Sequence, residues 1–308
     1  MHIFNQKTLL ESVSFEGIGL HSGVKTKVRL LPSLDNEGIV FKRTDLKTNN
    51  YVRANFQNVS SAKLCTTITN DYGVSVSTVE HLMAAFYILE IDNVVVEINN
   101  SEVPIMDGSS KDFIEEIKKV GLKNLFSKKK YLKILKTIKY TEGEKSISIE
   151  PSDESLKVDF ELNYTNELIG KQRNIIDFNH NDLHDVITAR TFCLFEDVEK
   201  IKKAGLAKGG SLENAVVVKG KEVLNEGGLR SAKEFVNHKI LDLAGDFLLS
   251  GYRILGNVKC IQGGHSLSNI FLKEIFKDSS NIEEAVQTNT KILKKDFKTP
   301  INKLAVNA

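Results

Sequence analysis

Apolar and polar positions alternate through much of the first hundred residues, which is the pattern of half-buried strands. Residues 8–32, TLLESVSFEGIGLHSGVKTKVRLLP, alternate on both sides of a glycine-rich segment, so we expect strands joined by a loop at 17–23. A second pair of strands is expected at GIVFKR and YVRANF. Helical periodicity replaces the alternation at 76–90, and a buried strand VVVEI and an amphipathic helix KDFIEEIKKVGL follow it.

The second half of the chain repeats this order of strands first and helices later. After the polar segment FSKKK at 126–130, alternation begins again in YLKILKTIKY, KSISIEP and LKVDFELNY, and helical patterns follow in VEKIKKAG and EFVNHKILDLAGDFLLSG. We therefore expect an α+β fold of two related domains, residues 1–126 and residues 131–308. The lysine-rich stretch that starts at Glu283 predicts a terminal helix with a frayed tail.

Composition and charge narrow the class of protein. Of 308 residues, 41% are hydrophobic and 27% charged, so a packed core is expected. The 42 basic and 40 acidic side chains leave a net charge of +2, which gives no electrostatic reason to expect nucleic acid or an anionic membrane surface as partner. No secretory signal is visible and no apolar run approaches about 18 residues, so we expect no membrane-spanning segment.

Cysteine usage bears on the compartment. Cys65, Cys193 and Cys260 lie far apart without CxxC spacing, and their odd number argues against a disulfide framework. A reducing cytosol fits this pattern. We therefore expect a cytoplasmic protein, and we expect it to be a monomer.

The stretch FVNHKILDLAGD places a polar group at every fourth position. In a helix, His238, Asp242 and Asp246 would form one column, and a histidine and an aspartate four residues apart can bind one metal ion. The alternative, favoured for this stretch alone, is the solvated side of an amphipathic helix. Gly245 weakens that alternative, because a glycine inside a helix costs about 1 kcal/mol relative to alanine and suggests close packing.

A second candidate is the pair Glu80 and His81 in STVEHLMAAF. Adjacent helical residues diverge by roughly 100 degrees, so the two side chains can do different jobs at one centre. The alternative is structural, since Ser77 followed by Glu80 is a capping-box signature and His81 would then be a partly buried histidine. The two-histidine HExxH zinc motif is absent.

Three further stretches carry candidate residues. In GGHSLSN, His265 is expected in a glycine-flanked loop, where a scaffold commonly holds functional groups, although a lone loop histidine is more often a surface residue. Thr191 and Phe192 in TARTFCLFED look by composition like an ordinary strand terminus. His21 lies in GIGLHSG, whose glycine spacing matches neither the dinucleotide fingerprint nor a P-loop.

Together these pieces suggest a reaction. Two histidines and one carboxylate are a common ligand set for catalytic zinc, which lowers the pKa of a bound water to about 7. A nearby glutamate can take the proton as the water attacks a carbonyl. A cationic His265 held by Asp246 would protonate the leaving nitrogen, and Thr191 could hydrogen-bond the oxyanion.

The same stretches resemble one family over nearly the whole chain: the zinc-dependent UDP-3-O-acyl-N-acetylglucosamine deacetylases of lipid A biosynthesis. Seven motifs in order are far more specific than any one of them. They are GIGLHSG (17–23), STVEHLMAAF (77–86), PIMDGSS (104–110), ARTF (189–192), LAKGGSLENAVV (206–217), HKILDLAGD (238–246) and GGHSLSN (263–269).

The resemblance implies a two-domain α+β fold, each domain a sheet layered with helices as a two-layer sandwich, with the active site between the domains. It implies hydrolysis of the N-acetyl group of UDP-3-O-(3-hydroxyacyl)-N-acetylglucosamine to the free amine and acetate. The site residues that it implies are the zinc ligands His81, His238 and Asp242, the general base Glu80, the general acid His265 with Asp246 behind it, Thr191 at the oxyanion, and Lys239, Phe192, His21 and Cys65 at the substrate, with Cys65 near the metal but not a ligand.

The segment after ARTF would belong to an insert that shapes an apolar passage for the acyl chain. The chain departs from the family pattern at three places: Cys193 stands where a glycine is usual, Asn237 where arginine is frequent, and GHSLSN where GHALNN is commoner. None of these removes a ligand or a catalytic group. Asp159 and Phe160 in VDFELNY are the candidates for uracil contacts.

Two other functions remain open from the sequence. A non-catalytic binding module would use Glu80 only as a helix cap and would bind no stoichiometric zinc. Another zinc amidase, such as a different sugar N-deacetylase or a peptidase, would keep the metal and change the substrate.

Overall fold

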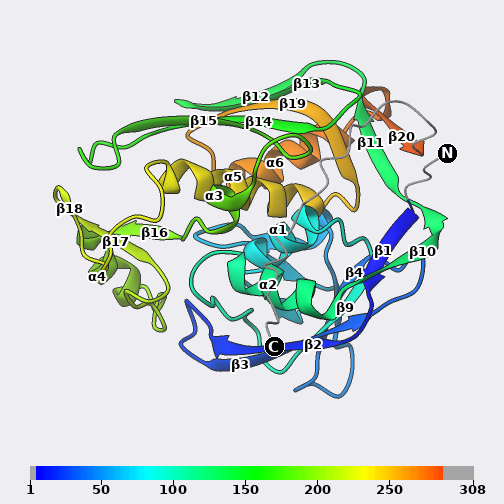
Figure 1. Cartoon of the computed structure of the whole chain (residues 1–308), viewed down its shortest axis with the longest axis horizontal. Coiled ribbons are helices and arrows are strands. Elements are labelled where there is room, and N and C mark those ends of the chain that lie inside the picture. The colour runs from blue at the N-terminus through cyan, green and yellow to red at the C-terminus, as the bar shows by residue number, and fades with distance from the viewer. Residues whose placement is uncertain (1–4, 287–308) are drawn as a thin grey trace, which may run out of the picture.

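The computed structural model describes residues 5–286, and within that range the chain forms a mixed α+β fold with several sheets and six α-helices. Two large sheets lie on opposite sides of a layer of helices, so that sheet, helices and sheet follow one another from the bottom to the top of Figure 1. The α+β class expected from the sequence is confirmed.

The first half of the chain builds a five-stranded sheet in the order β2-β3-β9-β4-β5. Its central strand, β9 (Val94–Ile98), pairs antiparallel with β3 and parallel with β4. Alternate residues of β9 are fully buried, which is the pattern of a strand with one face on the core. The other strands are β2 (Val13–Ile18), β3 (Lys25–Pro32), β4 (Ile39–Arg43) and β5 (Tyr51–Arg53).

Two helices belong to this half. α1 (Glu80–Ile88) is buried on every side over almost its whole length, so even its polar side chains lie inside the molecule. α2 (Lys111–Val120) is amphipathic, and on its apolar face the ring of Phe113 meets that of Phe15 edge-on at 5.1 Å. α1 therefore lies deep, and α2 packs beside it and against β2 (Figure 1).

The second half builds a seven-stranded sheet around β19 (Arg253–Ile261), which pairs with β11, β13 and β14. α5 (Glu234–Leu248) and α6 (His265–Phe276) pack on the face that looks toward the first half (Figure 1). The other strands are β11 (Lys130–Ile134), β12 (Ile138–Glu142), β13 (Lys145–Pro151), β14 (Leu156–Asn163), β15 (Lys171–Asp177) and β20 (Ile282–Val286).

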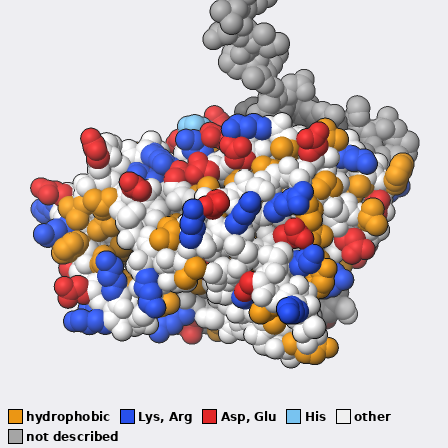
Figure 2. Space-filling model, turned by 90° about the horizontal axis from the view of Figure 1, so that it is seen from below, with side chains coloured by type: hydrophobic (Ala, Val, Ile, Leu, Met, Phe, Trp, Pro, Cys, Tyr) orange, Lys and Arg blue, Asp and Glu red, His pale blue; other side chains and the backbone are white. Residues whose placement is uncertain are grey.

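A small unit projects at the left of Figure 1, formed by residues between α3 (His184–Ile187) and α5. It contains β16 (Phe192–Leu194), α4 (Phe195–Lys203), β17 (Val216–Lys219) and β18 (Glu222–Val223). No residue of α4 is fully buried, and Phe195 and Leu212 are exposed. Figure 2 shows hydrophobic side chains gathered at this end of the molecule, and over the rest of that face basic, acidic and further hydrophobic side chains are interspersed.

The shorter elements connect these parts. They are β1 (Asn5–Leu9) with its partner β10 (Leu122–Lys128), the small sheet of β6 (Val59–Ser61), β7 (Thr67–Thr69) and β8 (Ser75–Val76), and the 3-10 turns η1 (Phe56–Asn58) and η2 (Ser279–Asn281).

The two halves meet where α1 crosses α5, and Gly245 makes this close crossing possible. A Cβ atom on Gly245 would lie 2.1 Å from the carbonyl oxygen of Glu80 and 3.0 Å from the backbone nitrogen of Ala84. No side chain fits between two backbones at that separation. The glycine is therefore required by the packing of α5 on the first turn of α1.

At the boundary expected near 126–130, β10 continues to Lys128, β11 begins at Lys130, and Lys129 between them is buried. Two other expectations from the sequence need correction. His265 is not in a loop: it is the first residue of α6, whose apolar residues recur with helical spacing and face the core. Residues 283–286 of the expected terminal helix belong to β20, and the rest of that helix lies outside the described residues.

Among residues 5–286, no helix is both long enough and apolar enough to cross a membrane.

Candidate active site and metal centre

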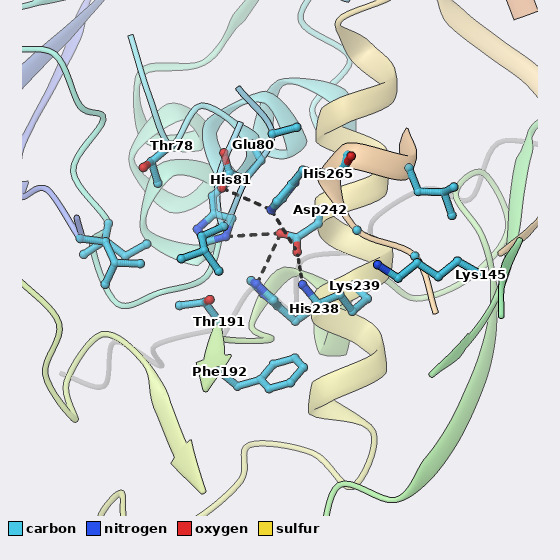
Figure 3. Close-up of a pocket in the computed structure, with 18 of the residues that line it drawn as sticks. Thr78, Glu80, His81, Lys145, Thr191, Phe192, His238, Lys239, Asp242 and His265 are labelled. Carbon is cyan, nitrogen blue, oxygen red and sulfur yellow. Dashed lines mark hydrogen bonds and ion pairs between the residues drawn. The ribbon is translucent and has the colours of Figure 1, made fainter. Parts of the chain in front are cut away.

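Six polar side chains from three helices meet in one buried cluster, and Figure 3 labels all of them except Asp246. They are Glu80 and His81 from the first turn of α1, His238, Asp242 and Asp246 from one face of α5, and His265 from the start of α6. The exposed fractions of these residues run from 1% to 9%, so the interpretation of the α5 column as a solvated helix face is wrong.

His81, His238 and Asp242 form a set of ligand atoms suited to a metal ion. Asp242 Oδ1 lies 3.4 Å from Nε2 of each histidine, and the three ligand atoms all lie within 4.8 Å of one another. The same Oδ1 atom is buried without a hydrogen-bond partner, and an unsatisfied buried carboxylate oxygen is costly unless a cation meets it. Two imidazoles and a carboxylate are a zinc ligand set that leaves a fourth position open.

The charge states of two of these ligands favour the binding of a cation. Burial lowers the pKa of His238 to about 3, so its ring is neutral. The carbonyl of Ala189 beside Nδ1 can only accept a hydrogen bond, so Nδ1 carries the proton and Nε2 has the free electron pair. Burial alone would raise the pKa of Asp242, but His238 and Lys239 hold it well below the usual value, so the carboxylate is ionised. Metal ions require deprotonated ligands, and these two already have that form at neutral pH.

Beside the metal ligands lies a second arrangement, suited to moving protons. His265 Nδ1 lies 2.9 Å from Asp246 Oδ2, and its Nε2 lies 3.6 Å from Glu80 Oε1. Burial alone would lower the pKa of His265, but the surrounding carboxylates, Asp246 foremost, raise it to about 10. Burial raises the pKa of Glu80. A cationic imidazole and a carboxylate of raised basicity therefore face the same space.

The capping-box interpretation of Glu80 is wrong. α1 has no side-chain cap, and the hydroxyl of Ser77 donates to the carbonyl of Ser101. Glu80 instead accepts a hydrogen bond from the backbone nitrogen of Thr66, at 3.0 Å. The Thr66 hydroxyl donates to Asp246 Oδ1 at 2.7 Å, so one residue holds both carboxylates.

All residues of the cluster except Asp246 line a cavity of about 330 Å³, and three of the other residues expected from the sequence line it as well. Thr191, just before β16, and Phe192, at its start, form one wall. Lys239 Nζ lies 3.0 Å from Asp242 Oδ2 and 5.6 Å from the centre of the Phe192 ring (Figure 3). The cavity therefore has charged groups at its base and an aromatic ring on one side.

His21 and Cys65 lie near this cavity but do not line it. The backbone nitrogen of His21 donates to the buried carboxylate of Glu102, and His21 Nε2 is buried without a partner. Cys65 is buried, and burial foremost, with the charge of Glu80, raises the pKa of its thiol to about 11. Its thiol is therefore protonated at neutral pH, which is consistent with a residue that is not a ligand.

The uracil candidates are not at the cavity either. Phe160 is buried in the core, and Asp159 forms an ion pair with Arg173 on the neighbouring strand.

Several residues that build the site carry no recognisable signal in the sequence. Thr66 carries no motif that would distinguish it from its threonine neighbour. Tyr164, which follows β14, and Glu142 and Lys145, which flank a Gly-Glu hairpin turn between β12 and β13, also line the cavity. The carbonyl of Ala189, which lies 3.1 Å from His238 Nδ1, has no side-chain signal at all.

Comparisons with known proteins agree on one family. The family described as LpxC, UDP-3-O-acyl N-acetylglycosamine deacetylase, matches residues 6–277. A UDP-3-O-acyl-N-acetylglucosamine deacetylase of Haemophilus ducreyi is 41% identical over 283 residues, which cover 90% of this chain and 92% of that protein. Proteins of the same name from Pseudoalteromonas atlantica (39% over 302 residues, 97% of this chain and 99% of the relative) and Francisella tularensis (41% over 282 residues, 90% and 98%) are also similar.

Proposed function

Because this chain belongs to the UDP-3-O-acyl N-acetylglycosamine deacetylase family, we propose that it removes the acetyl group from the glucosamine nitrogen of UDP-3-O-(3-hydroxyacyl)-N-acetylglucosamine in lipid A biosynthesis. The observation that carries the proposal is a single buried cluster that joins a two-histidine, one-carboxylate metal set to a Glu80–His265 pair. Amide hydrolysis needs both parts, because the carbonyl must be polarised and a poor nitrogen leaving group must be protonated.

His81, His238 and Asp242 would hold the zinc ion, which when bound polarises the substrate carbonyl and lowers the pKa of a water molecule. Glu80 would take the proton from the attacking water, since burial makes this carboxylate more basic than usual. Thr191, on the cavity wall, would donate a hydrogen bond to the oxygen that becomes negative.

His265 would then act as general acid. Its Nε2 points into the same space as Glu80, and its Nδ1 is held by Asp246, which orients the ring and stabilises the imidazolium. The imidazolium would deliver its proton to the leaving nitrogen as the carbon–nitrogen bond breaks. The products would be acetate and the free amine.

Substrate contacts are assigned by position around the cavity. Lys239 and Phe192 would contact the substrate, and His21 and Cys65 would support it from behind the lining residues. The unit of β16, α4 and β17 would be the insert that forms the acyl passage, because its apolar residues are only partly covered.

We also propose the remaining features that the sequence suggests. The chain would consist of two related domains, residues 1–126 and 131–308, each a sheet with its own helices, and the active site would lie where α1 meets α5. The protein would be a cytoplasmic monomer without a nucleic-acid partner. Its three cysteines are all free thiols, as a reducing compartment requires.

An acetate-release assay run with metal analysis tests the function. The enzyme should contain about one zinc ion per chain and should release acetate from UDP-3-O-acyl-N-acetylglucosamine faster than from UDP-N-acetylglucosamine, which lacks the acyl chain. A zinc-free protein would indicate a binding module instead. A zinc protein that hydrolyses both substrates equally would be another amidase.

A further inference from the structure

A buried ion pair lies just outside the metal ligands and has no part in the chemistry proposed above. Glu234, the first residue of α5, has no exposed surface, and the side chain of Arg190 is 8% exposed. Arg190 Nε donates to Glu234 Oε1 at 2.7 Å and Nη2 to Oε2 at 3.2 Å, which is a two-pronged contact.

The Glu234 carboxylate also binds backbone. Its Oε1 atom accepts from the nitrogen of Arg190 at 3.1 Å, and its Oε2 atom accepts from the nitrogen of Arg230 at 2.6 Å. Arg190 Nη2 in turn donates to the carbonyl of Gly228 at 2.8 Å. The side chain and the main chain of Arg190 are therefore both fixed to the first turn of α5.

Arg190 stands between two residues of the active site. The carbonyl of Ala189 lies 3.1 Å from His238 Nδ1, and the neutral His238 ring must donate there if its Nε2 is to face a metal. On the other side, the nitrogen of Thr191 donates to the carbonyl of Gly108 at 2.8 Å. Glu234 is one helical turn before His238 and on the same face of α5. The segment 189–190 therefore contacts the same helix twice, through Arg190 at Glu234 and through Ala189 at His238.

We propose that the Glu234–Arg190 ion pair positions the metal site: by fixing the main chain at Arg190, it holds the Ala189 carbonyl that orients the His238 ring. Glu234 and Arg190 are positioning residues and do not touch metal or substrate. The groups that orient a histidine ligand typically change metal affinity 10- to 100-fold when lost. The inference rests on the proposed function only in that the site binds zinc.

Zinc affinity of the full chain, measured by competition with a chromophoric chelator and without substrate, provides the test. Glu234→Gln should weaken zinc binding about 10-fold, because the amide cannot hold both the guanidinium and the two backbone nitrogens. The matched control is Asp92→Asn, which neutralises the partner of another buried cation, Lys129, 2.8 Å away and outside the site. The control should lose stability and keep the zinc affinity of the wild type.

A general loss of stability is separated from loss of positioning by a second variant. The double change Arg190→Met and Glu234→Leu removes both charges together, and an apolar pair in place of a buried ion pair usually preserves folding. It should remain folded and bind zinc as weakly as Glu234→Gln. The visible absorption bands of the Co²⁺-loaded protein should shift in both variants and not in Asp92→Asn, since they report ligand geometry.

Unchanged zinc affinity in the folded double variant would overturn the inference, as would an equal loss in Asp92→Asn. Either result, with zinc bound normally by the wild type, leaves the deacetylase proposal intact. A wild-type chain that binds no zinc would contradict both.

Discussion

At the scale of single residues, the two carboxylates Asp242 and Glu80 have different surroundings, which shift their pKa values in opposite directions. Asp242 has histidines and a lysine around it and stays ionised, whereas burial raises the pKa of Glu80. The pattern matches the rule that an acid–base site pushes the pKa values of neighbouring groups apart. Glu80 is therefore the carboxylate suited to take a proton, and Asp242 the one suited to a cation.

Replacement of Glu80 by glutamine tests this division. The amide oxygen can still accept from the backbone nitrogen of Thr66, so the fold should persist, but the proton acceptor is lost. We expect kcat to fall by about 10² to 10⁴ while the zinc content stays at the wild-type level. Acetate release and elemental analysis measure the two quantities, and a variant that keeps comparable turnover would remove Glu80 from the role of base.

At the scale of elements, the metal site depends on how closely two helices cross. His81 comes from α1, and His238 and Asp242 come from α5, so their ligand atoms converge only if the helices are at their observed separation. That separation is set where Gly245 meets the backbone of Glu80. Metal geometry tolerates little displacement, because ligand distances must hold within a few tenths of an ångström.

Replacement of Gly245 by alanine should therefore be harmful. Alanine gains about 1 kcal/mol of intrinsic helix propensity, but its Cβ would lie 2.1 Å from a backbone oxygen that cannot move away alone. Overpacking of this kind costs typically 1–3 kcal/mol, so we expect a less stable protein with weakened zinc binding. Urea unfolding and chelator competition measure these effects; a variant more stable than the wild type with full zinc affinity would show that the crossing is not tight.

At the scale of the whole molecule, a charge cluster joins the N-terminal strand, the end of α1 and the seven-stranded sheet. Glu90 pairs with Lys7 of β1, and Lys129 donates to the carbonyl of Glu90 at 2.9 Å. Arg253, at the start of β19, donates to the carbonyl of Tyr87 at 2.7 Å. These contacts are at the C-terminal end of α1, whereas Glu80 and His81 are in its first turn. Both ends of the helix are therefore held by contacts with other elements.

Glu90 should give this cluster a measurable pH dependence. Burial alone would raise the pKa of Glu90, but Arg253, Lys129 and Lys7 together lower it to about 2 from the ordinary 4.5. Because the folded value is the lower one, the stabilisation is complete above pH 4.5 and is lost as the pH falls toward 2. Glu90→Gln should therefore be less stable than the wild type at neutral pH, and the difference should shrink through that range.

Urea unfolding of both proteins at a series of pH values measures the difference. The metal site is common to both proteins, so its own pH dependence cancels. Glu16→Gln, which removes an exposed pair with Lys25, is the control and should change stability little at any pH. A Glu90 effect that stays constant between pH 4.5 and pH 2 would contradict the assignment.

Many features of this protein follow from local patterns in its sequence. The alternation of residues predicts most strands, and the four-residue spacing of His238, Asp242 and Asp246 places them on one helix face, because both periods are local properties of the backbone. The ordered motifs indicate the family, which the comparisons confirm. The prediction from local pattern was wrong at His265. The preceding glycines suggested a loop, but the apolar residues after His265 are buried on one face of a helix that begins at this residue.

Whether the α5 column of His238, Asp242 and Asp246 faces water or the interior is a question that local patterns do not answer. That question depends on the approach of α1, whose residues lie about 160 positions earlier in the chain, and no local period reports it. The convergence of three ligand atoms, the sharing of Thr66 between two carboxylates and the support of His238 by Ala189 are all contacts between distant segments. Gly245 illustrates the difference: the sequence shows that a glycine inside a helix is unusual, and the folded structure shows that the backbone of α1 leaves no room for a side chain there.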